Sequence, residues 1–228
     1  MDASLPAPVS RYLQLALGAE TAVPSTVRMR QSGMLRTSTR TRRWMDFTAV
    51  HTAQPLACAF TWDARVRLAP LLHVRVRDVL AEGIGSGEVR LQSLLRVGHD
   101  SGTPEMNSGS LHRFLAEAPW YPWALRPGPM LGWKHVAADR AVATLSCHGS
   151  TVSLEFRFAA SGEISGIYTP ARWGSFEGGY RQLPWEGRFL EFDRRGGVLV
   201  PHRAEVGWHR DGRLGLVWKG AIASWDCA

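Results

Sequence analysis

The sequence contains little cysteine and almost no lysine. Cys58, Cys147 and Cys227 lie far apart and form no CxxC pair, which excludes a disulfide-rich scaffold and zinc-finger spacing. We therefore expect three reduced thiols. Lysine supplies only Lys134 and Lys219 of the 27 basic residues, so arginine carries the formal net charge of +7. This bias fits a GC-rich genome at least as well as selection for phosphate binding.

Long apolar runs are also absent. No stretch reaches the roughly 18 apolar residues that a membrane helix needs. Residues 1–13 show neither the basic nor the apolar region of a signal peptide. Together with the dispersed cysteines, these features predict a soluble cytoplasmic protein.

Catalytic and cofactor motifs are missing. The chain contains no HExxH, no GxSxG and no Walker loop. Gly83, Gly85 and Gly87 precede a strand pattern rather than a helix, which favours a hairpin turn over a phosphate loop. A turn separates His209 from Asp211, so we expect no metal there. The sequence predicts no cofactor.

Most of the chain alternates apolar and polar residues with a period of two. In residues 58–68, for example, Phe60, Trp62 and Val66 share one face. Ten or eleven such strands at hairpin spacing, together with two helices, predict an antiparallel α+β domain spanning residues 1–228. Because long meanders curl, we expect a half-barrel: one curved sheet with both helices on its concave side.

The N-terminal segment, residues 1–20, carries the first predicted helix. Within residues 5–17, Val9, Tyr12 and Ala16 fall on one face at helical spacing. This amphipathic helix must dock on another element.

The second helix lies in residues 105–125, which we expect to form a short helix and an aromatic arm. Asn107 or Ser108 is the expected N-cap. Pro119 is expected to push the preceding residue out of the helical region. Residues 120–123 should then form an extended arm, because two prolines stiffen it. The apolar stripe of the helix consists of Leu111, Phe114, Leu115 and Ala118.

A basic stretch precedes and includes the first hairpin connection. Arg28 and Arg30 share one strand face, and residues 36–43 add four arginines. A phosphate-tracking surface is one interpretation. A charged sheet edge that blocks strand pairing is the favoured one, because no nucleic-acid fold is recognisable. We expect no specific nucleic-acid partner.

Several motifs together resemble a bacterial domain-of-unknown-function family. They are LPAPVSRYL, FTWDARV, VRDVLAEGIGSG, GSLHRFLAEAPWYPWAL and PWEGRF. That family is similar in architecture to the lipoprotein-carrier (LolA-like) superfamily. The resemblance implies a curved half-barrel whose concave face is closed by helices and binds acyl chains. The LolA-like carriers themselves are exported.

The ten tryptophans indicate where a ligand site lies. Tryptophan buries a large apolar surface but needs a partner for its N–H, so it is typical of cavity walls. We expect an apolar cavity beside the central helix that binds a small apolar or amphipathic molecule. Its predicted ligand-binding residues are Trp62, Arg113, Trp120, Trp123 and Trp185.

A small cofactor-independent enzyme, a hydrolase or an isomerase/cyclase working in the same cavity, is the alternative. Glu117 and Glu186 each lie close to a tryptophan, and a carboxylate buried beside aromatic rings can act as an acid or base. For each carboxylate, an exposed or arginine-paired role is the favoured interpretation. Arg113 precedes Glu117 by four residues, an order that opposes the helix dipole. We therefore expect this pair to face the concavity or the aromatic arm. The absence of a recognisable nucleophile favours binding, and the sequence predicts no oligomeric state.

Overall fold

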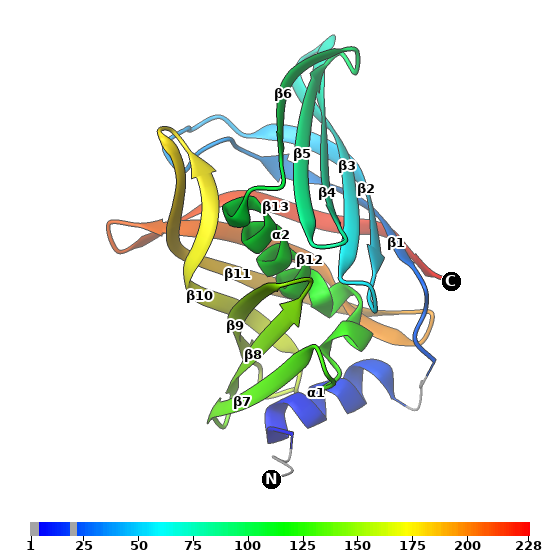
Figure 1. Cartoon of the computed structure of the whole chain (residues 1–228). Helices are drawn as coiled ribbons and strands as arrows, with labels where there is room; N and C mark the ends of the chain where they lie inside the picture. Colours follow the sequence, from blue (N-terminus) through cyan, green and yellow to red (C-terminus); the bar gives the residue numbers. More distant parts are fainter. Residues whose placement is uncertain (1–4, 19–21) are drawn as a thin grey trace.

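One antiparallel sheet dominates the computed structural model (Figure 1), which describes residues 5–18 and 22–228. Residues 1–4 and 19–20 of the expected N-terminal segment lie outside the described residues. The described part contains a sheet of 13 strands, two more than the upper end of the expected count. The predicted fold class, a curved antiparallel α+β sheet with two helices, is confirmed.

The element bounds follow the alternating patterns and the turns between them. The helical elements are α1 (Ala7–Leu17), α2 (Pro104–Glu117) and the short 3₁₀ turns η1 (Ala118–Trp120) and η2 (Pro122–Leu125). The strands are β1 (Val27–Leu35), β2 (Met45–Gln54), β3 (Ala59–Ala69), β4 (Leu72–Ala81), β5 (Ile84–Leu91), β6 (Leu95–Ser101), β7 (Leu131–Ala137), β8 (Arg140–Cys147), β9 (Ser150–Phe158), β10 (Ile164–Phe176), β11 (Gly179–Arg195), β12 (Val198–Arg210) and β13 (Arg213–Cys227).

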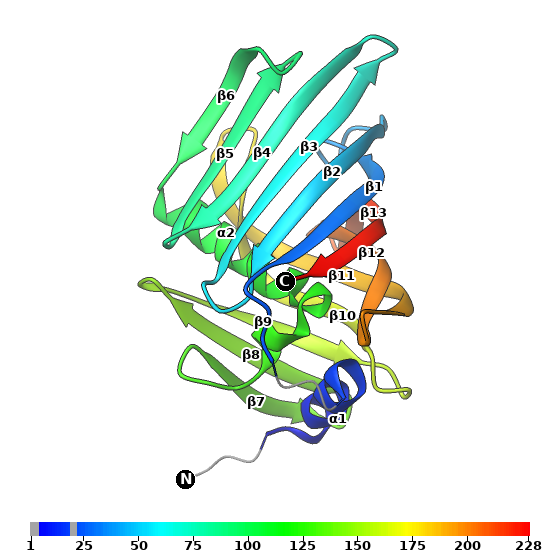
Figure 2. The same cartoon turned by 90° about the vertical axis from the view of Figure 1, so that its right-hand side faces the viewer.

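The strand order makes α2 a bridge. The sheet runs β6-β5-β4-β3-β2-β1-β13-β12-β11-β10-β9-β8-β7, so β6 and β7 are its two edges although they follow one another along the chain. Residues 102–130 must therefore cross from one edge to the other. They do so over the concave face, where α2 lies (Figures 1 and 2).

The first turn of α2 differs from its prediction. Thr103 is the N-cap, and its hydroxyl accepts a hydrogen bond from the Met106 N–H at 3.2 Å. The expected cap Asn107 lies within the helix instead. Its side chain accepts a hydrogen bond from the Gly85 N–H at 2.8 Å. The side chain that looked like a cap therefore ties α2 to β5.

The segment after α2 is also not the extended arm that we expected. Ala118 keeps helical angles, with φ −57° and ψ −25°. Residues 118–125 continue as η1 and η2, separated by Tyr121. Proline occupies an early position of each turn, where its missing N–H costs nothing. The tyrosine hydroxyl donates to the Phe114 carbonyl oxygen at 2.7 Å, which folds the segment back on α2.

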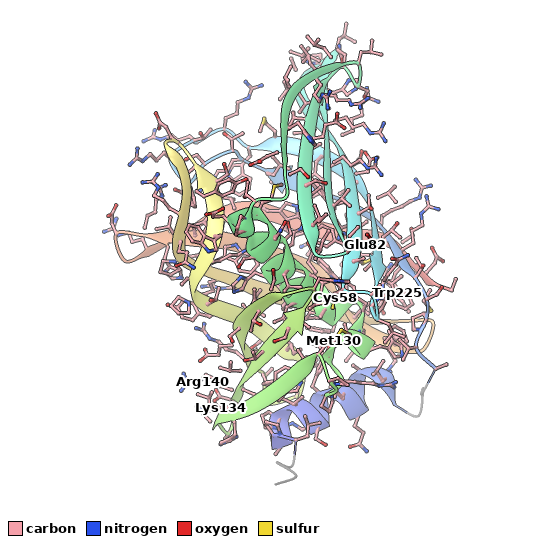
Figure 3. The ribbon with its side chains drawn as sticks, viewed as in Figure 1. Cys58, Glu82, Met130, Lys134, Arg140 and Trp225 are labelled. Carbon is pink, nitrogen blue, oxygen red and sulfur yellow. The ribbon has the colours of Figure 1, made fainter. Side chains whose placement is uncertain are left out.

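The two halves of the sheet approach each other around α2. The β4–β5 turn packs on the β8–β9 turn, where Gly83 lies against His148. Cys58 of the β2–β3 turn lies in the same region, next to Cys147 and near Met130 (Figure 3). Both thiols are buried. Because turns from the two halves of the sheet contact each other, the sheet must be curved, and one of its faces is concave.

The first helix covers one end of the concavity. α1 packs against β8, β12 and η2 (Figure 2). Val9 and Ala16 are fully buried, and Tyr12 lies 6.2 Å from the Phe158 ring between centroids. The amphipathic pattern therefore predicted the docking face correctly.

The basic stretch is not a sheet edge. β1 pairs with β13 on one side and β2 on the other, so it lies in the middle of the sheet. Arg28 and Arg30 are exposed on the outer face, while Val27 and Met29 are buried. The alternation of apolar and polar residues correctly predicts which side chains of β1 are exposed. It does not predict which strands lie next to β1 in the sheet.

Within residues 5–18 and 22–228, neither helix is both long enough and apolar enough to span a membrane.

Gly33 provides a test of the central β1–β13 seam. A Cβ at this position would overlap the Lys219 carbonyl oxygen and lie 2.8 Å from the Gly220 Cα. Gly33→Ala should lower the free energy of unfolding by at least about 2 kcal/mol, because rigid backbone cannot yield. Gly132→Ala in β7, with open space around it, is the matched control and should be neutral. Urea denaturation measures both, and equal stability of the two variants would contradict the predicted seam.

Candidate functional site

A cavity of about 320 Å³ lies between α2 and the concave face of the sheet. Five tryptophans from five different elements line it. They come from β3, η1, β11, β12 and β13: Trp62, Trp120, Trp185, Trp208 and Trp218. Aliphatic side chains from β4, β10, β12 and β13 complete the apolar wall: Val76, Ile167, Val206 and Val217.

The tryptophans are fixed by contacts behind the cavity wall. Trp62 Nε1 donates to Gln31 Oε1 at 3.0 Å, and Trp120 Nε1 donates to the Pro201 carbonyl oxygen at 3.0 Å. The Trp120 and Trp218 rings meet edge to face at 6.2 Å. The N–H groups of Trp62 and Trp120 are thereby satisfied, and their ring faces remain available to the cavity.

A compact ion cluster forms one part of the polar wall, which also includes Arg36 and Arg172. Arg113 donates from Nε to Glu117 Oε1 at 2.8 Å and from Nη1 to Asp78 Oδ2 at 2.7 Å. Its guanidinium also lies 5.0 Å from the ring centroids of both Phe60 and Trp62. Arg113 therefore links α2 to β4 and holds both carboxylates in place through hydrogen bonds.

Burial shapes the charge of this cluster. Burial raises the pKa of Asp78, although the Arg113 charge opposes that shift. Burial alone would lower the pKa of Arg113, but Glu117 and Asp78 together hold it above its ordinary value. Arg113 is therefore a permanent cation, and Asp78 protonates more readily than an ordinary carboxyl.

His51 lies behind the cluster. It is fully buried, and its Nε2 lies 3.5 Å from Glu117 Oε2. Its ring stacks against Phe60 and Tyr121, with centroid distances of 5.7 and 6.3 Å. Burial lowers its pKa to about 4, and Glu117 only partly offsets this. His51 is therefore neutral near pH 7.

A second arginine enters the wall from β10. The Arg172 guanidinium carbon lies 4.6 Å from the Trp185 ring centroid and 5.1 Å from that of Trp208. Its Nη2 donates to the Gly109 carbonyl oxygen at 3.0 Å. Burial, together with the nearby Arg113 charge, lowers the pKa of Arg172 to about 10, so it is still cationic at neutral pH.

The structure brings five of the seven predicted site residues together. Trp62, Trp120 and Trp185 line the cavity with Arg113 and Glu117. The expectation that the Arg113–Glu117 face of α2 looks into the concavity agrees with this geometry. The unfavourable order of the pair along the helix is offset by Asp78, which binds the same guanidinium.

The other two predicted residues lie outside the cavity. Trp123, in η2, is buried against Trp225, with rings 6.4 Å apart and nearly parallel. Glu186 faces the opposite side of the sheet from its neighbour Trp185, because successive strand residues alternate. There it accepts a hydrogen bond from His209 and lies close to two arginines, so it is a paired carboxylate.

Five wall or near-wall residues were not predicted: His51, Asp78, Arg172, Trp208 and Trp218. Alternation predicts that the side chains of Asp78 and His51 point inward, because each occupies an inward position in an alternating strand. For Arg172, alternation predicts the outward face. The structure differs because the β10–β11 register shifts between Thr169 and Arg172. Among the residues that the structure describes, no three His, Cys, Asp or Glu side chains gather as metal ligands would.

The curved sheet with a helix across its concave face has the LolA-like fold. The crystal structure of the LolA superfamily protein NE2245 from Nitrosomonas europaea matches with a TM-score of 0.50. The match covers 97% of this chain and 92% of that chain at 9% identity. Such low identity shows a shared fold and nothing finer.

The family is identified from the sequence. The model of the DUF6920 family, a family of unknown function, matches residues 3–226, so this chain belongs to that family. No curated protein sequence matches the chain.

Glu117→Gln tests whether the ion cluster is a buried network. The amide keeps the shape but removes the charge that Arg113 binds, so the free energy of unfolding should fall by about 1–3 kcal/mol. High salt should change this loss little, because the pair lies on a largely enclosed wall. Asp46→Asn is the control, since Asp46 pairs with Arg67 where both side chains are more than half exposed. That loss should stay under about 1 kcal/mol and shrink with salt. Equal salt sensitivity of the two variants would contradict the network.

The low pKa of His51 makes stability depend on pH. Above about pH 6.5 the ring is neutral in both the folded and the unfolded chain. As the pH falls toward about 4, only the unfolded chain takes up the proton, so the free energy of unfolding should decrease by up to about 3 kcal/mol.

His51→Phe should flatten this part of the stability profile. His112, whose pKa burial also lowers to about 4, supplies a remaining slope. His135→Phe, at an exposed position of β7, is the control and should leave the wild-type slope unchanged. Denaturation series from pH 7 to pH 4.5 make the comparison. An unchanged slope in His51→Phe would show that the ring is not a buried neutral base.

Proposed function

We propose that this protein binds a small apolar or amphipathic molecule in the tryptophan-lined cavity. The observation that carries the proposal is the cavity itself: about 320 Å³ of space with five tryptophans on its wall and one ion cluster. Ligand sites typically have this size and this mixture of apolar lining with a few polar groups. A filled core would have no such space.

Two further points support the proposal. Acyl-chain binding, which the family resemblance implies, agrees with a wall made of aromatic rings and aliphatic side chains. The ion cluster lies beside that wall and gives the site a polar end, as an amphipathic ligand requires. Small, chain-like and amphipathic are therefore the ligand properties that we propose.

The alternative, an enzyme with Glu117 as acid or base, retains one supporting observation. Glu117 lines the cavity and lies 3.5 Å from His51. Arg113 holds the carboxylate, however, and the other candidate, Glu186, lies on the opposite face of the sheet. Binding is therefore the function that we favour. The single domain, the cytoplasmic location and the lack of a specific nucleic-acid partner stay predictions.

A cavity-filling variant tests the proposal. Val206 lines the cavity from β12, so Val206→Trp should occupy ligand space and weaken binding of dodecanol, a neutral chain-like probe, by at least about tenfold. The melting temperature should not fall in parallel, since the added ring fills existing space. Isothermal titration calorimetry measures the affinity.

Val136→Trp is the matched control, because Val136 is 43% exposed on β7. It should bind dodecanol as the wild type does. Failure of the wild-type protein to bind dodecanol, or equal binding by Val206→Trp, would overturn the proposed function.

A further inference from the structure

Arg172 lies where the tryptophan cavity meets a second, more polar space. This polar compartment has a volume of about 210 Å³, and its wall includes Ser86, Ser110 and Tyr180. Four side chains line both spaces: Asp78, Arg113, Arg172 and Trp208. An amphiphile whose apolar part lies among the tryptophans would therefore present its polar end at these side chains.

The two arginines of this shared wall differ in their partners. Arg113 binds both carboxylates of the cluster, Asp78 and Glu117. Arg172 has no carboxylate oxygen within 4.0 Å among the described residues, and its one hydrogen bond is to the Gly109 carbonyl oxygen. Its Nε is buried without a partner. Arg172 is thus a cation held by two aromatic faces and a backbone oxygen.

Of the three unpartnered buried side-chain atoms that the structure describes on the wall of the tryptophan cavity, two are donors. Trp185 Nε1 is buried without an acceptor, as is Arg172 Nε, and Trp185 is only 4% exposed. The third atom, Glu117 Oε2, is an acceptor and lies 3.5 Å from His51 Nε2. A buried donor without an acceptor is destabilising, because the hydrogen bond it loses with water on folding is not replaced. A ligand group rich in acceptors would remove that cost.

We propose that Arg172, together with the Trp185 N–H, binds the anionic group of an amphiphile whose apolar part occupies the tryptophan cavity. The anion is a carboxylate or a phosphate, because the planar guanidinium matches the paired oxygens of both groups. This inference rests on the proposed function and adds the charge and position of the ligand's head.

The charges around the site favour an anion over a cation. Arg113 already engages Asp78 and Glu117, so a cationic head at the shared wall would find neither of them available and would face Arg172. Glu105 lines the polar compartment but not the tryptophan cavity. Asp78 and Glu117 act on Arg172 only at longer range, so a neutral head would leave Arg172 without a directly bound carboxylate. An anion supplies that direct partner and keeps the existing cluster intact.

Four probes with the same twelve-carbon chain isolate the charge: dodecanol, dodecanoate, dodecyl phosphate and dodecyltrimethylammonium. At about pH 8 the carboxylic acid is ionised. Wild-type protein should bind at least one anionic probe about tenfold or more tighter than dodecanol, and the cation more weakly than dodecanol. The tighter of the two anions identifies the head as carboxylate or phosphate.

Arg172→Gln should remove this preference, so that neither anionic probe binds this variant more tightly than dodecanol does. Arg210→Gln is the matched control, because the Arg210 guanidinium also lies over a ring, 5.3 Å from Phe176, yet lines neither space. It should retain the preference. If Arg172→Gln does not fold, Trp185→Phe keeps a ring and removes only the N–H. That variant should reduce the preference about threefold or more.

The outcomes separate the two proposals. If dodecanol binds but the anions bind no tighter, or if the preference survives Arg172→Gln, the anion site is wrong and the cavity proposal stands. If no probe binds the wild-type protein, both proposals fail.

Discussion

The fold depends on one topological constraint: the chain must travel from edge strand β6 to edge strand β7 of the same open sheet. The crossing runs over the concave face and carries α2, η1 and η2 into it. The apolar stripe of α2 packs against the apolar side chains of the concave face. Trp120, in the 3₁₀ turn that follows α2, forms part of the cavity wall. Because a helix of this width cannot fill the whole concavity, space remains between α2 and strands β10 to β13. The site is thus a product of the crossing.

The second constraint is the charge that the crossing helix brings with it. Arg113 faces the sheet, so its charge must be matched within the wall. Asp78 from β4 and Glu117 from α2 both bind it, and His51 stays neutral behind them. Such a network is strongly destabilised by removal of one partner, although an apolar replacement of the whole network can be neutral. Its position next to an apolar cavity agrees with a role in ligand binding, because packing alone does not require it.

Much of the fold and part of the site can be predicted from the alternation of apolar and polar residues. The rest depends on strand order and on local irregularities, which alternation does not reveal. Alternation correctly predicts that Trp62 points inward. It predicts the same for Asp78, but a polar side chain is not expected on the core face, so Asp78 was not included in the predicted site. Arg172 was not predictable by alternation, because the irregular pairing near Pro170 reverses the direction of the side chains that follow. Trp123 was assigned to the cavity by proximity in sequence, but two 3₁₀ turns direct it toward Trp225. Strand order, which places β1 in the middle of the sheet, depends on long-range pairing.

We propose that the space beside α2 is a ligand site with an apolar wall and a cationic end. A crystal structure of the protein with bound dodecanoate would show whether this is so. We expect the alkyl chain among the tryptophans, with the carboxylate at the guanidinium of Arg172. A cavity filled by rearranged protein side chains, or a chain bound elsewhere on the molecule, would contradict it.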